Sequence, residues 1–167
     1  GGAAGPGGGV LGVGDDEARH FQMLANRLEA LGSHYGALPA HDGLWQSAIQ
    51  TAHDLAARLA VVPMVLEARG LDVTPGMIDS MQAMGDDASA ACLRVIYKDE
   101  IGHVAVGHRW FCWLCMQHGT APEAQFQRLV RQCFKGRVKP PFNTAGRDKD
   151  GLIAGFYTPM VADNQIR

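Results

Sequence analysis

The chain has 167 residues, 47% hydrophobic and 19% charged, which is ordinary for one globular domain with a real core. Its formal net charge of −2 gives no general reason to expect nucleic acid or an acidic membrane surface as a partner. The longest apolar stretches are far shorter than the roughly 20 residues of a membrane helix. No signal sequence opens the chain, and the cysteines are too few for a disulfide scaffold, so we expect reduced thiols in a cytoplasmic protein. The cysteines are Cys92, Cys112, Cys115 and Cys133.

The pattern of apolar residues predicts an all-α fold. Residues 1–14 are Gly-rich and predict a flexible tail, while residues 15–135 carry helical periodicity and residues 136–167 read as a mostly irregular extension. Within the periodic part, the expected helices run from about 15 to 31, 43 to 69, 74 to 84, 86 to 119 and 120 to 134. Pro63 lies inside the second of these and should kink it or leave a carbonyl free, and Gly70 should end it.

A short pattern occurs twice, as Asp16-Glu17-Ala18-Arg19-His20 and as Asp99-Glu100-Ile101-Gly102-His103. Glu and His three apart on a helix differ by about 60° and about 4.5 Å, so one metal ion can touch both. Both pairs fall in the middle of an apolar helix face. A buried carboxylate without a partner is costly, so two such pairs on facing helices favour a bound cation.

Glu67 is the best candidate for a third carboxylate ligand. Its helix face otherwise carries mainly small or apolar residues, which allows helices to approach closely, and it lies one turn after Pro63, where the helix can be irregular. Carboxylate and imidazole ligands together suit iron or manganese, whereas zinc more often takes tetrahedral Cys/His sites. The predicted metal ligands are Glu17, His20, Glu67, Glu100 and His103.

The remaining polar and sulfur-containing residues have these interpretations. Asp16, Arg19 and Asp99 either orient the imidazoles or form surface ion pairs. His53 is predicted to be a core histidine or one that orients a ligand, with a role as a metal ligand as the alternative. The Cys112-x-x-Cys115 pair lies inside a predicted helix and reads as buried thiols. The basic run from Arg128 to Lys139 reads as a solvated face, with phosphate or RNA as the alternative.

These motifs resemble the ferritin-like di-iron superfamily, and more narrowly a bacterial ferritin-like family known as domain of unknown function 455. The resemblance covers about residues 15–156 and rests on these segments: EARHF (17–21), LPAHDGLW (38–45), TAHD (51–54), VLEARGLDVTPGM (65–77), DEIGHVAVG (99–107) and PPFN (140–143). It implies a ferritin-like helical bundle with a six-ligand site. Here the upstream helix with the remaining carboxylate is replaced by the Gly-rich stretch. The truncated bundle is then expected to be unstable alone or to cover its exposed face as a homodimer.

The resemblance implies two iron ions, with manganese as the alternative, in an oxidase or hydroxylase that uses O2 and a small-molecule substrate. A tRNA substrate is a sub-case, because the basic run can hold phosphates. Two alternatives stay open: a ferroxidase that handles iron, and a truncated helical protein whose incomplete metal site is inactive.

Overall fold

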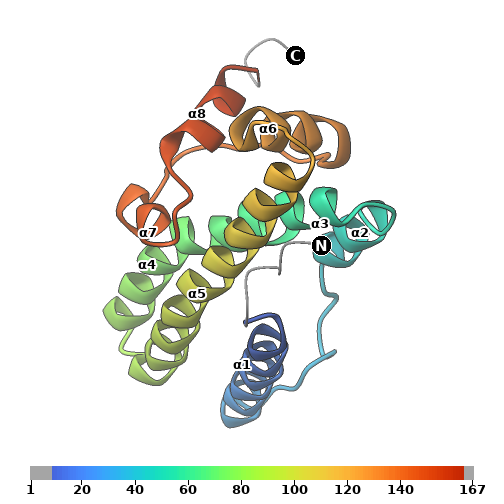
Figure 1. The fold of residues 1–167 in the computed structure, drawn as a ribbon. Helices are drawn as coiled ribbons and strands as arrows, with labels where there is room; N and C mark the ends of the chain where they lie inside the picture. The colour runs from blue at the N-terminus through green and yellow to red at the C-terminus, as the bar shows by residue number, and fades with distance from the viewer. Residues whose placement is uncertain (1–8, 164–167) are drawn as a thin grey trace.

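The computed structural model describes residues 9–163, and every regular element within that range is a helix (Figure 1). The elements are α1 (Val10–Ala30), α2 (Gly43–Gln50), α3 (Leu55–Val61), the π-helical η1 (Val62–Glu67), α4 (Ala68–Ala83), α5 (Asp87–Gln117), α6 (Pro122–Cys133), α7 (Thr144–Lys149) and α8 (Ala154–Asp163). The all-α prediction is therefore confirmed for the described range. None of these helices is long and apolar enough to cross a membrane.

The N-terminal helix starts earlier than the periodicity indicates. We expected it to begin at Asp15, but α1 begins at Val10, because Gly12 and Gly14 are accommodated inside a helix that α5 supports. The first eight residues of the expected tail lie outside the described range. Helix α1 runs antiparallel to α5: Arg27 donates to Asp86 at the start of α5, while Gly9 lies against Val106 further along it.

The expected helix 43–69 is wrong in both its continuity and its end. It is interrupted after Gln50, and a new helix starts where the Asp54 carboxylate accepts hydrogen bonds from the backbone N–H groups of Ala56 and Ala57. Gly70 does not end the helical run either, since α4 continues to Ala83 and absorbs the helix expected to begin at Thr74.

Two prolines sit inside helices because side-chain amides replace the hydrogen bonds they delete. Pro75 has no N–H for the Leu71 carbonyl, and that carbonyl accepts from Asn143 Nδ2 at 3.1 Å. Pro159 likewise frees the Gly155 carbonyl, which accepts from Gln127 Nε2 at 3.0 Å. Both donors come from other parts of the chain, so tertiary packing stabilises these helices.

Helices α4 and α5 form a tight antiparallel hairpin. Gly85 at the turn has φ of 77°, a conformation that favours glycine, and the Asp86 N–H closes the end of α4 by donating to the Met81 carbonyl. The Asp86 carboxylate then caps α5 by accepting from the Ser89 N–H. This hairpin positions α5 across the molecule, with η1 packed beside it.

The core lies between α3, η1, α4, α5, α6 and α8, and its large members include Met64, Leu71, Phe111, Phe126 and Tyr157. The expectation of a mostly irregular C-terminal extension misses α7 and α8. Helix α7 is held by a buried ion pair, in which Arg147 donates to both carboxylate oxygens of Asp72 at 2.8 and 2.7 Å, and α8 packs against α6.

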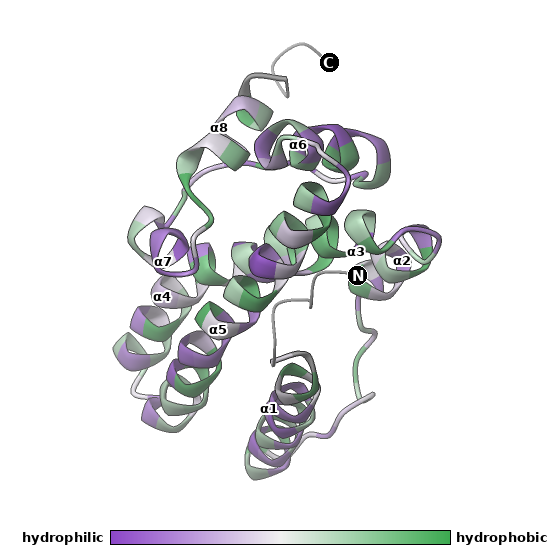
Figure 2. Cartoon of the chain, viewed as in Figure 1, coloured by the Kyte–Doolittle hydropathy of each residue, from purple (hydrophilic) through white to green (hydrophobic). Residues whose placement is uncertain are grey.

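One face of α1 keeps apolar side chains in contact with solvent. Phe21 is 53% exposed, Leu24 43% and Leu28 36%, although they share the helix with the predicted ligands Glu17 and His20. Figure 2 shows hydrophobic residues along α1, which Figure 1 places at the edge of the molecule. An exposed apolar face of this kind indicates an interaction surface.

Candidate metal centre

The antiparallel packing of α1 on α5 brings the two Glu-x-x-His pairs face to face. The imidazole centroids of His20 and His103 are 5.7 Å apart, and both side chains are buried. Because the helices run in opposite directions, each histidine meets the glutamate of the other pair. His103 Nδ1 lies 3.1 Å from a carboxylate oxygen of Glu17, and His20 Nδ1 lies 3.9 Å from one of Glu100.

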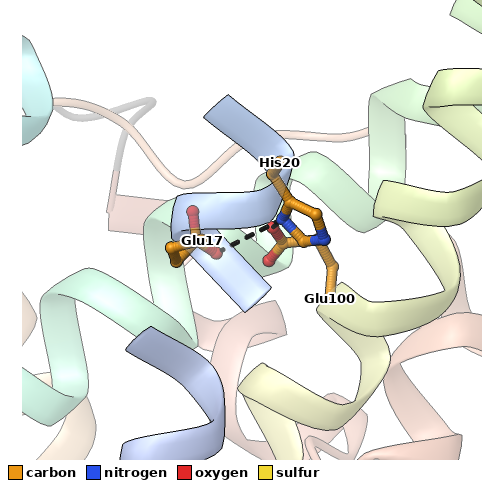
Figure 3. Close-up of side chains that lie close together, drawn as sticks. All are labelled: Glu17, His20 and Glu100. Carbon is orange, nitrogen blue, oxygen red and sulfur yellow. Dashed lines mark ion pairs between the residues drawn. The ribbon is translucent and has the colours of Figure 1, made fainter. Parts of the chain in front are cut away.

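Two groups of ligand atoms result, and Glu100 belongs to both. In the first, one atom each from Glu17, His20 and Glu100 lies within 4.8 Å of the others. Figure 3 shows the two carboxylates and the imidazole of this group pointing toward one another. In the second, Glu67 of η1 joins Glu100 and His103 within the same limit. Three helical segments therefore converge on one small volume.

The aspartates that precede each glutamate hold the histidines of the opposite helix. Asp99 lies 3.1 Å from His20 Nε2, and Asp16 lies 3.2 Å from His103 Nε2. Arg19 donates to both aspartates, at 2.7 Å to Asp16 and 2.8 Å to Asp99. Hydrogen bonds from Arg19 and His103 lower the pKa of Asp16, and those from His20 and Arg19 lower that of Asp99.

An ionised carboxylate only accepts, so each Nε2–H is the donor, and Nδ1 is the nitrogen that faces the other carboxylates and would ligate a metal. Asp16 and Asp99 thus contact the imidazoles directly. The alternative prediction, that these residues form surface ion pairs, is also confirmed in part, because Arg19 forms ion pairs with both aspartates and is exposed.

The inward atoms of four predicted ligands make no well-oriented hydrogen bond, and their near neighbours include other members of the cluster, such as the Glu17 oxygen 3.1 Å from His103 Nδ1. These inward atoms are His20 Nδ1, His103 Nδ1, Glu67 Oε2 and Glu100 Oε2, and all four are buried. Buried polar atoms without hydrogen-bond partners are rare in native proteins. Here they come from residues that already converge, so the donor set fits a metal ion that would satisfy all of them together.

Without a metal, protons must balance the charge of these carboxylates. Burial, and then the nearby Glu100 carboxylate, raise the pKa of Glu67 to about 7. The neighbouring carboxylates of Glu100 and Glu17 raise the pKa of His103 to about 11, and the same histidine lowers the pKa of Glu17. Metal ligation needs a neutral imidazole and an ionised carboxylate, so a metal would displace the protons from His103 and Glu67.

A largely apolar cavity of about 480 Å³ opens beside the carboxylates of Glu17, Glu67 and Glu100. Its apolar walls are formed by Leu44, Trp45, Ala48, Val62, Leu66 and Ile96. No Lys, Arg or His is among its described lining residues. The cavity is of a size that suits a small organic molecule. The sequence pattern did not reveal it, because its walls come from α2, η1, α4 and α5.

Comparison with known families agrees with the sequence resemblance at the level of the family. Residues 8–158 match the family described as "Protein of unknown function (DUF455)". The chain belongs to this DUF455 family. It is also 39% identical, over 150 residues, to an uncharacterized protein of Haemophilus influenzae, a match that covers 87% of this chain and 49% of the relative. The chain therefore spans about half the length of that relative. No solved structure matches this chain.

In this DUF455 chain the position of His53 agrees with neither prediction made from the sequence. Its side chain is exposed, and it lines a separate cavity with Gln132 and Lys135. The expectation of a buried histidine failed because the chain breaks between α2 and α3 at this point, so His53 lies in a turn.

The cysteines of this DUF455 chain are free thiols, as expected. Cys112 contacts His108 at 3.3 Å one turn away on α5. Burial raises the pKa of the Cys112 thiol to about 11 and that of Cys115 above its usual range, which disfavours the reactive thiolate. Cys115 is buried and Cys112 is half-buried, so the prediction of buried thiols is confirmed for Cys115.

Proposed function

We propose that this chain carries a carboxylate-bridged two-metal centre. One ion would be held by Glu17, His20 and Glu100, and the second by Glu67, Glu100 and His103. The observation that carries the proposal is that Glu100 belongs to both groups while the buried inward atoms of four ligands make no well-oriented hydrogen bond. Mixed carboxylate and imidazole ligands favour iron, with manganese as the alternative.

In helical bundles with a di-iron or di-manganese centre, the complete ligand set has two Glu-x-x-His pairs and one Glu from each of two other helices. The proposed site lacks one of these carboxylates. Glu17 is half exposed, and the apolar side chains of Phe21 and Leu24 flank it on α1. A helix that supplied the last carboxylate would cover this face. A second copy of the chain, or a further part of a longer protein, could provide it.

We further propose that the centre serves an O2-dependent oxidase or hydroxylase. Two ferrous ions would supply the electrons that activate O2 for attack on an organic substrate. The residues of the chain would hold the ions, orient the imidazoles through Asp16 and Asp99, and place apolar walls beside the carboxylates. The apolar cavity beside Glu67 favours oxidation of a small, uncharged organic molecule over storage of hydrated iron.

Anaerobic loading with Fe(II), or with Co(II) as an optical probe, followed by metal analysis of the desalted protein tests the centre. The wild type should retain up to two ions per chain. Glu100→Ala should lose both, because both groups share that carboxylate, and His103→Ala should lose one. Glu29→Ala, an exposed glutamate on the same helix as Glu17, is the matched control and should match the wild type.

Wild-type protein that retains no metal, or a Glu100→Ala variant that retains both ions, would overturn the metal centre. Admission of O2 to the iron-loaded protein then separates the two iron-based functions. An oxidase should consume O2 catalytically when an electron donor is supplied and keep its iron content constant. Iron that accumulates beyond two ions per chain would instead support ferroxidation and storage.

A further inference from the structure

Glu67 occupies the last position of a π-helical turn. The Ala68 N–H donates to the Pro63 carbonyl, five residues back, where a regular α-helix would use the residue four back. The wider turn contains one extra residue, so every following side chain is rotated by about 100° relative to an uninterrupted α-helix. The direction of the Glu67 carboxylate therefore depends on this turn.

Pro63 makes the turn possible, and α5 holds it in place. Proline has no N–H to donate to the Leu59 carbonyl, so the regular ladder cannot pass through it. Its ring lies against Gly107 of α5 so closely that a Cβ at Gly107 would meet Pro63 Cβ and Cγ at 2.5 Å. Both residues are buried.

The contact lies one helical turn from a proposed ligand on each helix. Pro63 precedes Glu67 by four residues on η1, and Gly107 follows His103 by four on α5. The close contact of Pro63 with Gly107 therefore lies one turn from the place where Glu67 meets Glu100 and His103. A change in the separation of the helices here is transmitted directly to the distance between these ligands.

We propose that Pro63 and Gly107 are positioning residues, whose contact sets the place of Glu67 in the second ligand group. The inference rests on the proposed metal centre and assigns a task to two residues that cannot ligate metal. A methyl group at position 107 would need about 1 Å more room to reach ordinary contact with Pro63. Helix η1 would have to move, and Glu67 would move with it, away from Glu100 and His103.

Gly107→Ala tests this inference, with Gly102→Ala as the matched control. Gly102 lies on the same helix, closer to the ligands in sequence, and a Cβ there would meet nothing within 4 Å. Co(II) binding should be counted by metal analysis and followed by titration. Gly107→Ala should reproduce Glu67→Gln: one ion is lost or bound at least about tenfold more weakly, while the other stays. Gly102→Ala should bind both ions as the wild type does.

The ion that remains in Gly107→Ala should belong to the first ligand group. Adding His20→Ala to that variant should therefore remove it, a result that general loosening of the fold would not produce. Should Gly107→Ala fail to fold, Pro63→Ala provides the second variant. It restores an N–H, removes part of the ring contact, and should also weaken only the Glu67-dependent ion.

Two results would overturn the inference while leaving the metal centre intact. One is full binding of both ions by Gly107→Ala, or by Pro63→Ala where the first variant does not fold. The other is equal weakening of both ions. Wild-type protein that binds no Co(II) would overturn the metal centre itself and this inference with it.

Discussion

Replacing Glu67 by Gln should stabilise the metal-free chain at pH 8 while weakening metal binding. Burial, and then the Glu100 carboxylate, raise the pKa of Glu67 from 4.5 to about 7. A group with a raised pKa in the folded chain contributes stability that is complete below pH 4.5 and is lost as the pH rises to about 7. Gln cannot ionise, so the variant should not lose stability by this route.

The size of the effect follows from the pKa shift. At about 1.4 kcal/mol per pKa unit, a rise from 4.5 to about 7 corresponds to about 3 kcal/mol in the free energy of unfolding. The difference between Glu67→Gln and the wild type should grow between these two pKa values and level off above them. Bound metal should make the wild type more stable than Glu67→Gln, because the metal stabilises the chain that ligates it fully.

Urea unfolding followed by circular dichroism, with a chelator present, measures this difference at acid and alkaline pH. Glu29→Gln serves as the control, since Glu29 is exposed on α1, and its difference from the wild type should not depend on pH. A difference between Glu67→Gln and the wild type that is likewise constant with pH would refute the reasoning, because Glu67 would then not be a buried acid.

Three further predictions follow from individual contacts. Asp99→Asn should weaken metal binding by about 10-fold or more in calorimetric titration, because His20 loses its charged partner; unchanged affinity would assign Asp99 to the surface. The number of protons released per bound ion should fall as the pH rises past about 7, since Glu67 is then already ionised, and a constant number would contradict this. Asn143→Ala should lower the free energy of unfolding by roughly 2–4 kcal/mol in urea, because the Leu71 carbonyl loses its donor and α7 loses its cap; a change below the lower value would contradict it.

The helical class and the chemistry of the candidate site could be predicted from local pattern. Apolar residues at helical spacing placed Glu100 and His103 on an inward face, and the buried His103 agrees with that expectation. The same arithmetic placed Glu17 inward, yet its side chain is half exposed. Periodicity gives the direction of a side chain on its helix, but it does not determine whether another helix covers that face.

Helix ends were predicted poorly where other elements supply the missing hydrogen bonds. Gly70 and Pro75 are expected to stop a helix in isolation, yet α4 runs through both, because Asn143 donates to the carbonyl that Pro75 leaves free. The C-terminal helices have weak local signals: α7 forms around the buried pair of Arg147 and Asp72, and α8 places the Tyr157 ring against the Arg147 guanidinium. Such compensation comes from residues far away in sequence and has no local signature.

The repeated Glu-x-x-His pattern was enough to predict which residue types could hold metal, because ligand spacing within one helix depends only on helix geometry. The pairing between helices was decided by the tertiary structure. The antiparallel contact of α1 and α5 joins Asp99 to His20 and Asp16 to His103, and it makes Glu100 common to both ligand groups. The place of Glu67 was decided in the same way, since a π turn and a glycine on another helix determine where its carboxylate points. Relations between helices depend on packing across the whole chain, which a periodic pattern within one segment does not contain.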